Sequence, residues 1–265
     1  MLGTWPDISY AIIKIAQFAS NSSSDHMNKA KQILWYLNSS KNLSLVFNGD
    51  SDKGLIAFTN SDWASDKIMC KSQTGYFFQL AGASISWQSC AQTTIALLST
   101  KAEYMALCDC CKQAKWIQTL LSKLGINVGP IPINGDNQGS IFLGSNPVQG
   151  NRSKHIDIQC HFIWQCIEDK EAKLYFVKGA KNPVDMFTKS LGHVKFHKFR
   201  GQLGFENKWL LIQLISIVDQ GQHSKGECWM RCDKHSVTSV INAHNRVTHV
   251  WKILEESINS VERPH

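Results

Sequence analysis

The sequence predicts an α/β fold, in which five strands form one mixed sheet that is flanked by helices and preceded by an α-hairpin. Three features support this prediction. Apolar residues recur at helical spacing in the first 42 positions. Strand-like runs bounded by turn residues begin at position 54, and from there the elements follow the order βββ-α-β-α-β-α. Consecutive strands predict an antiparallel meander, whereas strands separated by helices predict parallel crossovers, so one sheet should contain both.

The α-hairpin is predicted for residues 1–42. Pro6 and Asp7 suit the start of a first helix, residues 21–24 form a polar linker, and a second helix begins near Asp25. The apolar residues expected to face inward are Ile8, Ala11, Ile12, Ile15 and Ala16 in the first helix and Met27, Ala30, Ile33, Leu34 and Leu37 in the second.

Strand-like sequence follows the hairpin. Residues 43–47 place alternate apolar side chains on one face and predict a short strand, which a turn at 48–50 ends. The first three strands of the main sheet are predicted at 54–63, 75–82 and 83–87, and a tight glycine turn joins the last two.

A long amphipathic helix is predicted next, with Ser99 or Thr100 as its N-cap. Glu103 lies in the predicted first turn, where two interpretations stay open: a glutamate that interacts with the helix dipole, or a metal ligand directed at a neighbouring strand. The apolar residues that define the helix are Leu107, Ala114, Ile117, Leu121 and Leu124.

The remaining elements bring polar side chains to strand ends, where ligands gather in sheets of this kind. They are strands at 131–136 and 172–177 and helices at 137–143, 154–169 and 183–190. The polar residues at these junctions are Asn60, Glu103, Asp136 and Asp185. Other interpretations stay open for two of them. Asp136 could instead cap the helix that follows it, and Asp185 could be a surface residue in the first turn of a helix.

The composition is that of a soluble protein with one good core. Of 265 residues, 43% are hydrophobic, and the net charge of +7 is compatible with a polyanionic partner without proving one. Nine scattered cysteines without a secretory segment predict reduced thiols and a cytoplasmic or nuclear protein that is not secreted. The longest apolar run, 209–218, is too short to span a bilayer, and no membrane or organic cofactor is expected.

A cluster of carboxylates without accompanying His or Cys residues suits hard cations such as Mg²⁺ or Mn²⁺. Two such ions about 4 Å apart activate a water molecule and stabilise the leaving oxygen in phosphodiester hydrolysis. The sequence around these residues resembles the ribonuclease H domain of copia-type retrotransposon Pol polyproteins. The matching segments, in family order and spacing, are 58–64, 72–76, 86–87, 99–104, 136–139, 154–157 and 185–189.

This resemblance implies a ribonuclease H-like five-stranded mixed sheet and hydrolysis of the RNA strand of an RNA–DNA hybrid with divalent metal. The second, third and fourth acids of the family fall on Glu103, Asp136 and Asp185. The first falls on Asn60, where the family has aspartate, so a full negative charge is missing. We therefore predict strongly impaired catalysis and possible loss of the two-metal site.

Two further residues bear on this prediction. Asp62 lies on the same strand face as Asn60 if the strand stays regular, and is a candidate substitute ligand. Lys101 stands where family members usually carry an acid, which would weaken metal binding.

The resemblance also predicts the partners and the domain organisation. Residues 1–42 resemble the C-terminal end of the reverse transcriptase region but lack its polymerase aspartates, so no polymerase activity is expected. Residues 43–205 form the ribonuclease H-like domain, and 206–265 a poorly ordered tail without a functional interpretation. The expected partners are an RNA–DNA hybrid and other parts of the Pol polyprotein. The predicted nucleic-acid contacts are Lys154, His155, Asn137 and Gln138.

The competing hypotheses are a catalytically inactive nucleic-acid-binding module and a translated pseudogene product. Trp63 and Trp87 suit either base stacking or, preferably, core packing. Three cysteines on the long helix, Cys108, Cys110 and Cys111, are expected to be packing thiols. Residues 228–232 with His235 form a weak zinc candidate, because their spacing fits no familiar motif.

Overall fold

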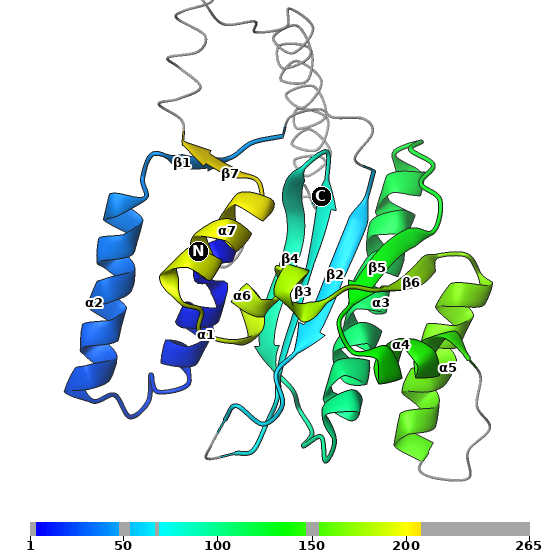
Figure 1. Cartoon of the computed structure of the whole chain (residues 1–265), viewed down its shortest axis with the longest axis horizontal. Coiled ribbons are helices and arrows are strands. Elements are labelled where there is room, and N and C mark those ends of the chain that lie inside the picture. Colours follow the sequence, from blue (N-terminus) through cyan, green and yellow to red (C-terminus); the bar gives the residue numbers. More distant parts are fainter. Residues whose placement is uncertain (1–3, 48–53, 67–68, 147–153, 208–265) are drawn as a thin grey trace, which may run out of the picture.

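The computed structural model describes residues 4–47, 54–66, 69–146 and 154–207. A central five-stranded sheet separates two groups of helices, and a helical hairpin lies at one side (Figure 1). The zinc candidate and residues 208–265 of the predicted tail lie outside the described residues, as does the predicted turn at 48–50.

The sheet confirms the predicted mixture of antiparallel and parallel pairs. Its strands, in spatial order, are β4 (Ala83–Ala91), β3 (Gln73–Leu80), β2 (Ile56–Ser61), β5 (Ile131–Gly135) and β6 (Ala172–Phe176). The pairs β4–β3 and β3–β2 are antiparallel, and the pairs β2–β5 and β5–β6 are parallel. Ala81 and Gly82 join β3 to β4 with φ values of 50° and 87°, the conformation that a two-residue hairpin turn requires.

The larger core lies between one face of the sheet and three helices. These are α3 (Ser99–Lys123), α4 (Gln138–Ser145) and α5 (Lys154–Glu168). The predicted N-cap of α3 is wrong: the helix already begins at Ser99, and Leu98 occupies the cap position without a side-chain hydrogen bond. Glu103 consequently lies one residue beyond the first turn. The core residues include Ala57, Phe78, Leu107, Ile117, Ile133 and Ile163.

The opposite face of the sheet carries a second core, formed with α6 (Asp185–Thr188) and α7 (His193–Gln202). Phe77 of β3 stacks against Phe58 of β2 and against Phe187 of α6. Gly75 of β3 permits this close approach, because a Cβ there would lie 2.8 to 2.9 Å from side-chain atoms of α6 and the loop before it. The helix α7 was not predicted from the sequence.

A second, two-stranded sheet closes the domain. The predicted short strand appears as β1 (Leu43–Leu45), and it pairs antiparallel with β7 (Phe205–Asn207) rather than with the main sheet. The chain that follows the hairpin therefore meets the end of the ribonuclease H-like segment.

The N-terminal hairpin confirms the predicted pair of helices. It consists of η1 (Pro6–Ile8), α1 (Ser9–Ala16) and α2 (Ser24–Ser39). The inward assignment of Met27 and Leu34 was wrong, because their side chains are 54% and 58% exposed. The helix α1 has eight residues and α2 has sixteen, so α1 is too short to bury the whole apolar stripe. Tyr36 of α2 instead connects the hairpin to α7, where its ring packs edge-on against Phe196.

Other predictions about single residues are resolved by burial. Cys108, Cys110 and Cys111 are buried, as expected for packing residues. Trp87 packs partly buried against the second core. The core interpretation of Trp63 was wrong, because this side chain is 58% exposed and donates its indole N–H to the carbonyl of Ala96.

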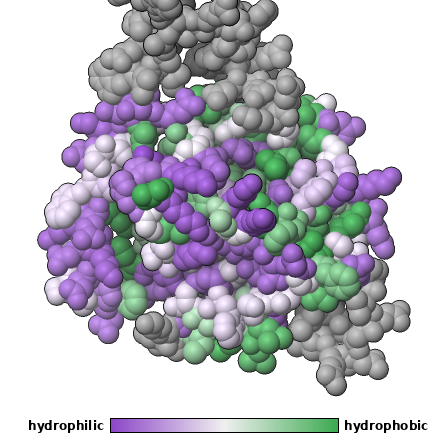
Figure 2. All heavy atoms as spheres, viewed as in Figure 1, coloured by the Kyte–Doolittle hydropathy of each residue, from purple (hydrophilic) through white to green (hydrophobic). Residues whose placement is uncertain are grey.

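The outer surface is mainly hydrophilic on the face shown in Figure 2, with hydrophobic side chains in smaller groups. Among the described helices, none has the length and apolar character needed to cross a bilayer.

Candidate carboxylate site at the edge of the sheet

The predicted site residues meet where β2 and β5 end. These strands are parallel neighbours, so their carboxyl ends lie at the same edge of the sheet. Asn60 is the next-to-last residue of β2 and is 3% exposed, and Asp136 directly follows β5. Glu103 comes from α3 on one face of the sheet and Asp185 from α6 on the other. The structure thus brings all four positions to one edge.

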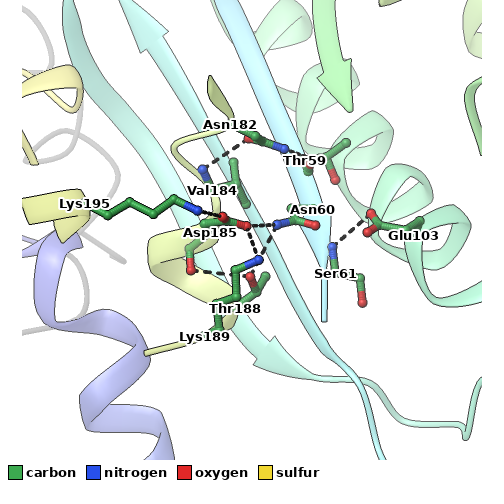
Figure 3. Close-up of polar contacts among 10 residues, drawn as sticks. All are labelled: Thr59, Asn60, Ser61, Glu103, Asn182, Val184, Asp185, Thr188, Lys189 and Lys195. Carbon is green, nitrogen blue, oxygen red and sulfur yellow. Dashed lines mark hydrogen bonds and ion pairs between the residues drawn. The ribbon is translucent and has the colours of Figure 1, made fainter. Parts of the chain in front are cut away.

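Asp185 is the residue on which the polar contacts of this edge converge. Its side chain is 2% exposed, and Asn60 Nδ2 donates a hydrogen bond to Oδ1 over 2.6 Å. Lys189 Nζ lies 2.7 Å from the same oxygen, and Lys195 Nζ lies 2.5 Å from Oδ2 (Figure 3). Three donors therefore surround one buried carboxylate, and two of them carry a full positive charge.

A fully buried amide holds α6 against the end of β2. Asn182 Nδ2 donates to the backbone carbonyl of Thr59 over 3.0 Å, and its Oδ1 accepts from the backbone N–H of Val184 over 3.2 Å (Figure 3). Asn182 thereby fixes the turn that leads into Asp185. The sequence carried a signal for this residue, since Asn before Pro183 favours such a turn.

Glu103 approaches β2 from the other face. Its Oε2 accepts a hydrogen bond of 3.0 Å from the backbone N–H of Ser61, the last residue of the strand. Burial, followed by the negative charge of Asp136, raises the pKa of Glu103 to about 9, whereas the Ser61 N–H and Lys189 oppose the shift. In this arrangement the carboxyl group holds a proton at neutral pH.

Asp136 completes the cluster. Burial raises its pKa, the carboxylate of Asp185 adds to the rise, and Lys189 opposes it. The loop segment η2 (Gly179–Lys181) covers this side chain so closely that a Cβ on Gly179 would lie 2.9 Å from Asp136 Oδ2. The negative charge of Asp136 raises the pKa of Glu103, and that of Asp185 raises the pKa of Asp136. The three acids therefore share one electrostatic environment.

A divalent ion of this kind needs several oxygen ligands that converge on one point. Within the described ranges, no group of three His, Cys, Asp or Glu residues is arranged to hold a metal. Asn60 directs an N–H toward Asp185, where a ligand would present an oxygen, and both oxygens of Asp185 already meet ammonium groups. As arranged, Asp185 does not fit a divalent ion unless both lysines move away. The ligand roles of Glu103, Asp136 and Asp185 stay predictions.

Asp62, the candidate substitute ligand, lies just beyond the end of β2. Its Oδ1 accepts a hydrogen bond from the backbone N–H of Gln73, the first residue of β3. Burial raises its pKa, and Ser65, Lys14 and Lys189 are among the groups that oppose the rise. Asp62 therefore stabilises the start of β3, and its role as a ligand stays a prediction.

The predicted nucleic-acid contacts at Asn137, Gln138, Lys154 and His155 stay predictions. Asn137 is the N-cap of α4, because its Oδ1 accepts from the backbone N–H of Ser140 over 2.9 Å, and Gln138 is exposed beside it. Lys154 and His155 begin α5, and their side chains lie outside the described residues.

Sequence reasoning missed the two lysines of the site. Lys189 ends a matching segment four residues after Asp185, a spacing that brings side chains together on a helix. Lys195 reaches Asp185 from a different helix, α7, which carried no apolar periodicity to reveal it. Its contact depends on tertiary packing that local sequence does not show.

The fold and the site define an α/β domain with an acidic cluster at the carboxyl edge of a mixed sheet. No protein-family model matches the chain. The retrovirus-related Pol polyprotein from transposon TNT 1-94 of Nicotiana tabacum is 35% identical over 207 residues, which make up 78% of this chain and 16% of that protein. The corresponding polyprotein from transposon RE1 of Arabidopsis thaliana is 34% identical over 202 residues, 76% of this chain and 14% of that protein.

The chain is homologous to a segment of the retrovirus-related Pol polyproteins of copia-type transposons, as the resemblance of its motifs indicated. It spans only 16% and 14% of the length of these two relatives. A ribonuclease H1 isolated from compost is a solved structure with 11% identity and a TM-score of 0.41, covering 51% of this chain and 93% of that protein. Because that likeness is low, the fold assignment rests on the order and direction of the strands.

Proposed function

We propose that the chain is the ribonuclease H segment of a transposon Pol polyprotein whose hydrolytic activity is strongly impaired. The ancestral reaction, which the resemblance implies, is metal-dependent hydrolysis of the RNA strand in an RNA–DNA hybrid. Homology to the Pol polyproteins and the meeting of Glu103, Asp136 and Asp185 at one sheet edge support this assignment. Mg²⁺ or Mn²⁺ is the cofactor of the ancestral reaction.

The hydrogen bond between Asn60 and Asp185 is the observation that carries the proposed impairment. A metal site needs oxygen atoms that converge on one point. Asn60 Nδ2 instead donates a hydrogen bond of 2.6 Å to Asp185, the carboxylate with which it would share the metal ion. This contact stabilises a closed arrangement in which the two side chains satisfy one another. No hydrolytic step is assigned to the present residues.

A second candidate function is a nucleic-acid-binding module that retains the fold without the chemistry. The pairing of Asp185 with two lysines favours it, because this neutralises the buried acid without a metal ion. Both functions predict that the protein binds an RNA–DNA hybrid, and they differ only in cleavage.

Cleavage of a labelled RNA–DNA hybrid with Mg²⁺ and with Mn²⁺ tests the proposal, using the full chain and Asn60→Asp. We expect negligible cleavage by the unchanged chain and measurable cleavage by the variant, because the variant restores the missing acid. Efficient cleavage by the unchanged chain that is lost in Asp62→Asn would show that the first ligand was misplaced. Binding without cleavage by either protein would favour the binding module.

A further inference from the structure

The two lysines at Asp185 differ from it in exposure. The carboxylate is 2% exposed, whereas the side chains of Lys189 and Lys195 are 49% and 40% exposed. The ammonium groups therefore lie between a buried acid and solvent. An anion that approaches this edge of the sheet meets the lysines before it meets the carboxylate.

Both lysines approach from elements that hold them in place. Lys189 follows Asp185 by one helical turn, and Lys195 extends from α7 with its Nζ 5.2 Å from the ring centroid of Phe199. Phe199 is fully buried in the second core. The contact of Lys195 with Asp185 is therefore backed by packed structure, unlike a flexible ion pair on an open surface.

The two ammonium groups face more than one carboxylate. Lys189 and Lys195 both contact Asp185, and both also act to lower the pKa of the neighbouring Asp136. Oδ1 of Asp185 already accepts from Asn60 and Lys189, and Oδ2 accepts from Lys195. Each ammonium has three N–H donors, so donors remain for a further acceptor. A phosphate oxygen that approaches from solvent would meet these ammonium donors before the buried carboxylate.

We propose that Lys189 and Lys195 take the place of a divalent cation at Asp185, so that this edge binds a phosphate group of a nucleic-acid backbone without a divalent ion. The proposal rests on the proposed function, which supplies the nucleic-acid partner. Lysine suits this role because its ammonium is a compact charge that binds phosphate without a fixed orientation. The ligand class is a phosphodiester, and the lysines supply charge and hydrogen bonds but no chemistry.

Binding of a fluorescently labelled RNA–DNA hybrid to the full chain, followed by anisotropy, tests the proposal. The first comparison uses the unchanged protein in excess EDTA and in Mg²⁺ at equal ionic strength. We expect dissociation constants that agree within about twofold, because the resident cations are lysines. A loss of affinity of about tenfold or more in EDTA would overturn the inference and leave the proposed function standing.

The second comparison uses Lys189→Gln and Lys195→Gln, with Lys112→Gln as the matched control. Lys112 pairs with Asp109 on α3 over 2.9 Å, and it is 57% exposed. Each site variant should bind roughly tenfold more weakly and reduce the salt dependence of log K by about one, whereas the control should change little. Site variants that bind as tightly as the control would overturn the inference.

A loss of folding stability in the variants does not confound the measurements of hybrid binding. The comparison of EDTA with Mg²⁺ needs no variant, and Lys195→Arg retains the charge if Lys195→Gln does not fold. Binding that survives in Lys195→Arg would support the charge-based role. Absence of hybrid binding by the unchanged protein in both buffers would overturn this inference together with the proposed nucleic-acid partner.

Discussion

The substitution Asn60→Asp should destabilise the protein in the absence of divalent ions. Asn60 is 3% exposed, and its amide N–H donates to Asp185 Oδ1 over 2.6 Å. Replacing the amide with a carboxylate removes this donor and places a second negative charge beside the first. The same change restores the acid expected of the family, so the destabilisation should coexist with a gain in metal binding.

The size of the stability loss expected for Asn60→Asp follows from the geometry around Asp185. A hydrogen bond to a charged group contributes about 1.5–3 kcal/mol, and two unit charges at about 2.6 Å repel by about 6 kcal/mol at an effective dielectric constant of about 20. Lys189 and Lys195 offset part of this repulsion. Proton uptake by the new carboxyl group limits the cost to about 4 kcal/mol at neutral pH. We expect a net loss of about 3 kcal/mol, or about 6–12 °C in Tm.

Thermal unfolding in EDTA, followed by circular dichroism, measures this loss. Asn60→Leu serves as the control, because it removes the hydrogen bond without adding a charge. The difference between the two variants isolates the repulsion, and it should shrink at acidic pH as the introduced carboxyl group becomes protonated. An Asn60→Asp protein that unfolds at the temperature of the unchanged chain in EDTA would refute the assigned contact between Asn60 and Asp185.

Three further substitutions test the fold around the site. Gly75→Ala should lower the free energy of unfolding in urea by about 1–3 kcal/mol, because its Cβ would lie 2.8 Å from Thr188 Cγ2, whereas Gly54→Ala, which meets open space, should not. Burial and the hydrogen bond to Asp7 raise the pKa of Tyr36 to about 12, so stability should fall as pH rises from about 10 to about 12, and Tyr36→Phe should remove that part of the fall. Gln92→Leu should cost about 1–3 kcal/mol and speed amide exchange at the start of α3, because the carbonyl of Ala102 loses a 2.9 Å donor; unchanged exchange would contradict this.

The sheet was predictable because its signals are local. The turn at Gly82 and the apolar runs at β2, β3 and β5 each specify one element, and the order of elements then fixes which pairs are parallel. The four site positions were predictable for a similar reason. Strand ends and helix starts lie at defined sequence positions, and parallel neighbours bring them to the same edge.

The missed features depend on contacts between distant parts of the chain. Asn60 and Asp185 are 125 residues apart, and no periodicity reveals that the amide would donate to the acid rather than bind beside it. The helix α7 was missed because basic and apolar residues alternate irregularly along it. The exposed Met27 and Leu34 show the opposite failure: their spacing is helical, but α1 is too short to cover them.

The exposure of the Trp63 side chain has a related cause. An aromatic residue directly after a buried strand is usually expected to join the core, yet β2 ends at Ser61 and the chain turns outward at Ala64, whose φ is 51°. The indole then lies along the surface and donates to Ala96. Local sequence indicated the strand but not the position at which it leaves the sheet.

We propose that Asn60 and two lysines satisfy Asp185 in place of a metal ion. Binding of Mn²⁺ to the full chain and to Asn60→Asp, measured by the loss of the electron paramagnetic resonance signal of free Mn²⁺, tests this directly. We predict that the unchanged chain leaves the free signal unaltered, while Asn60→Asp takes up Mn²⁺ in a saturable manner. Uptake of Mn²⁺ by the unchanged chain with the same affinity as the variant would show that Asn60 and the lysines do not keep a metal ion from Asp185.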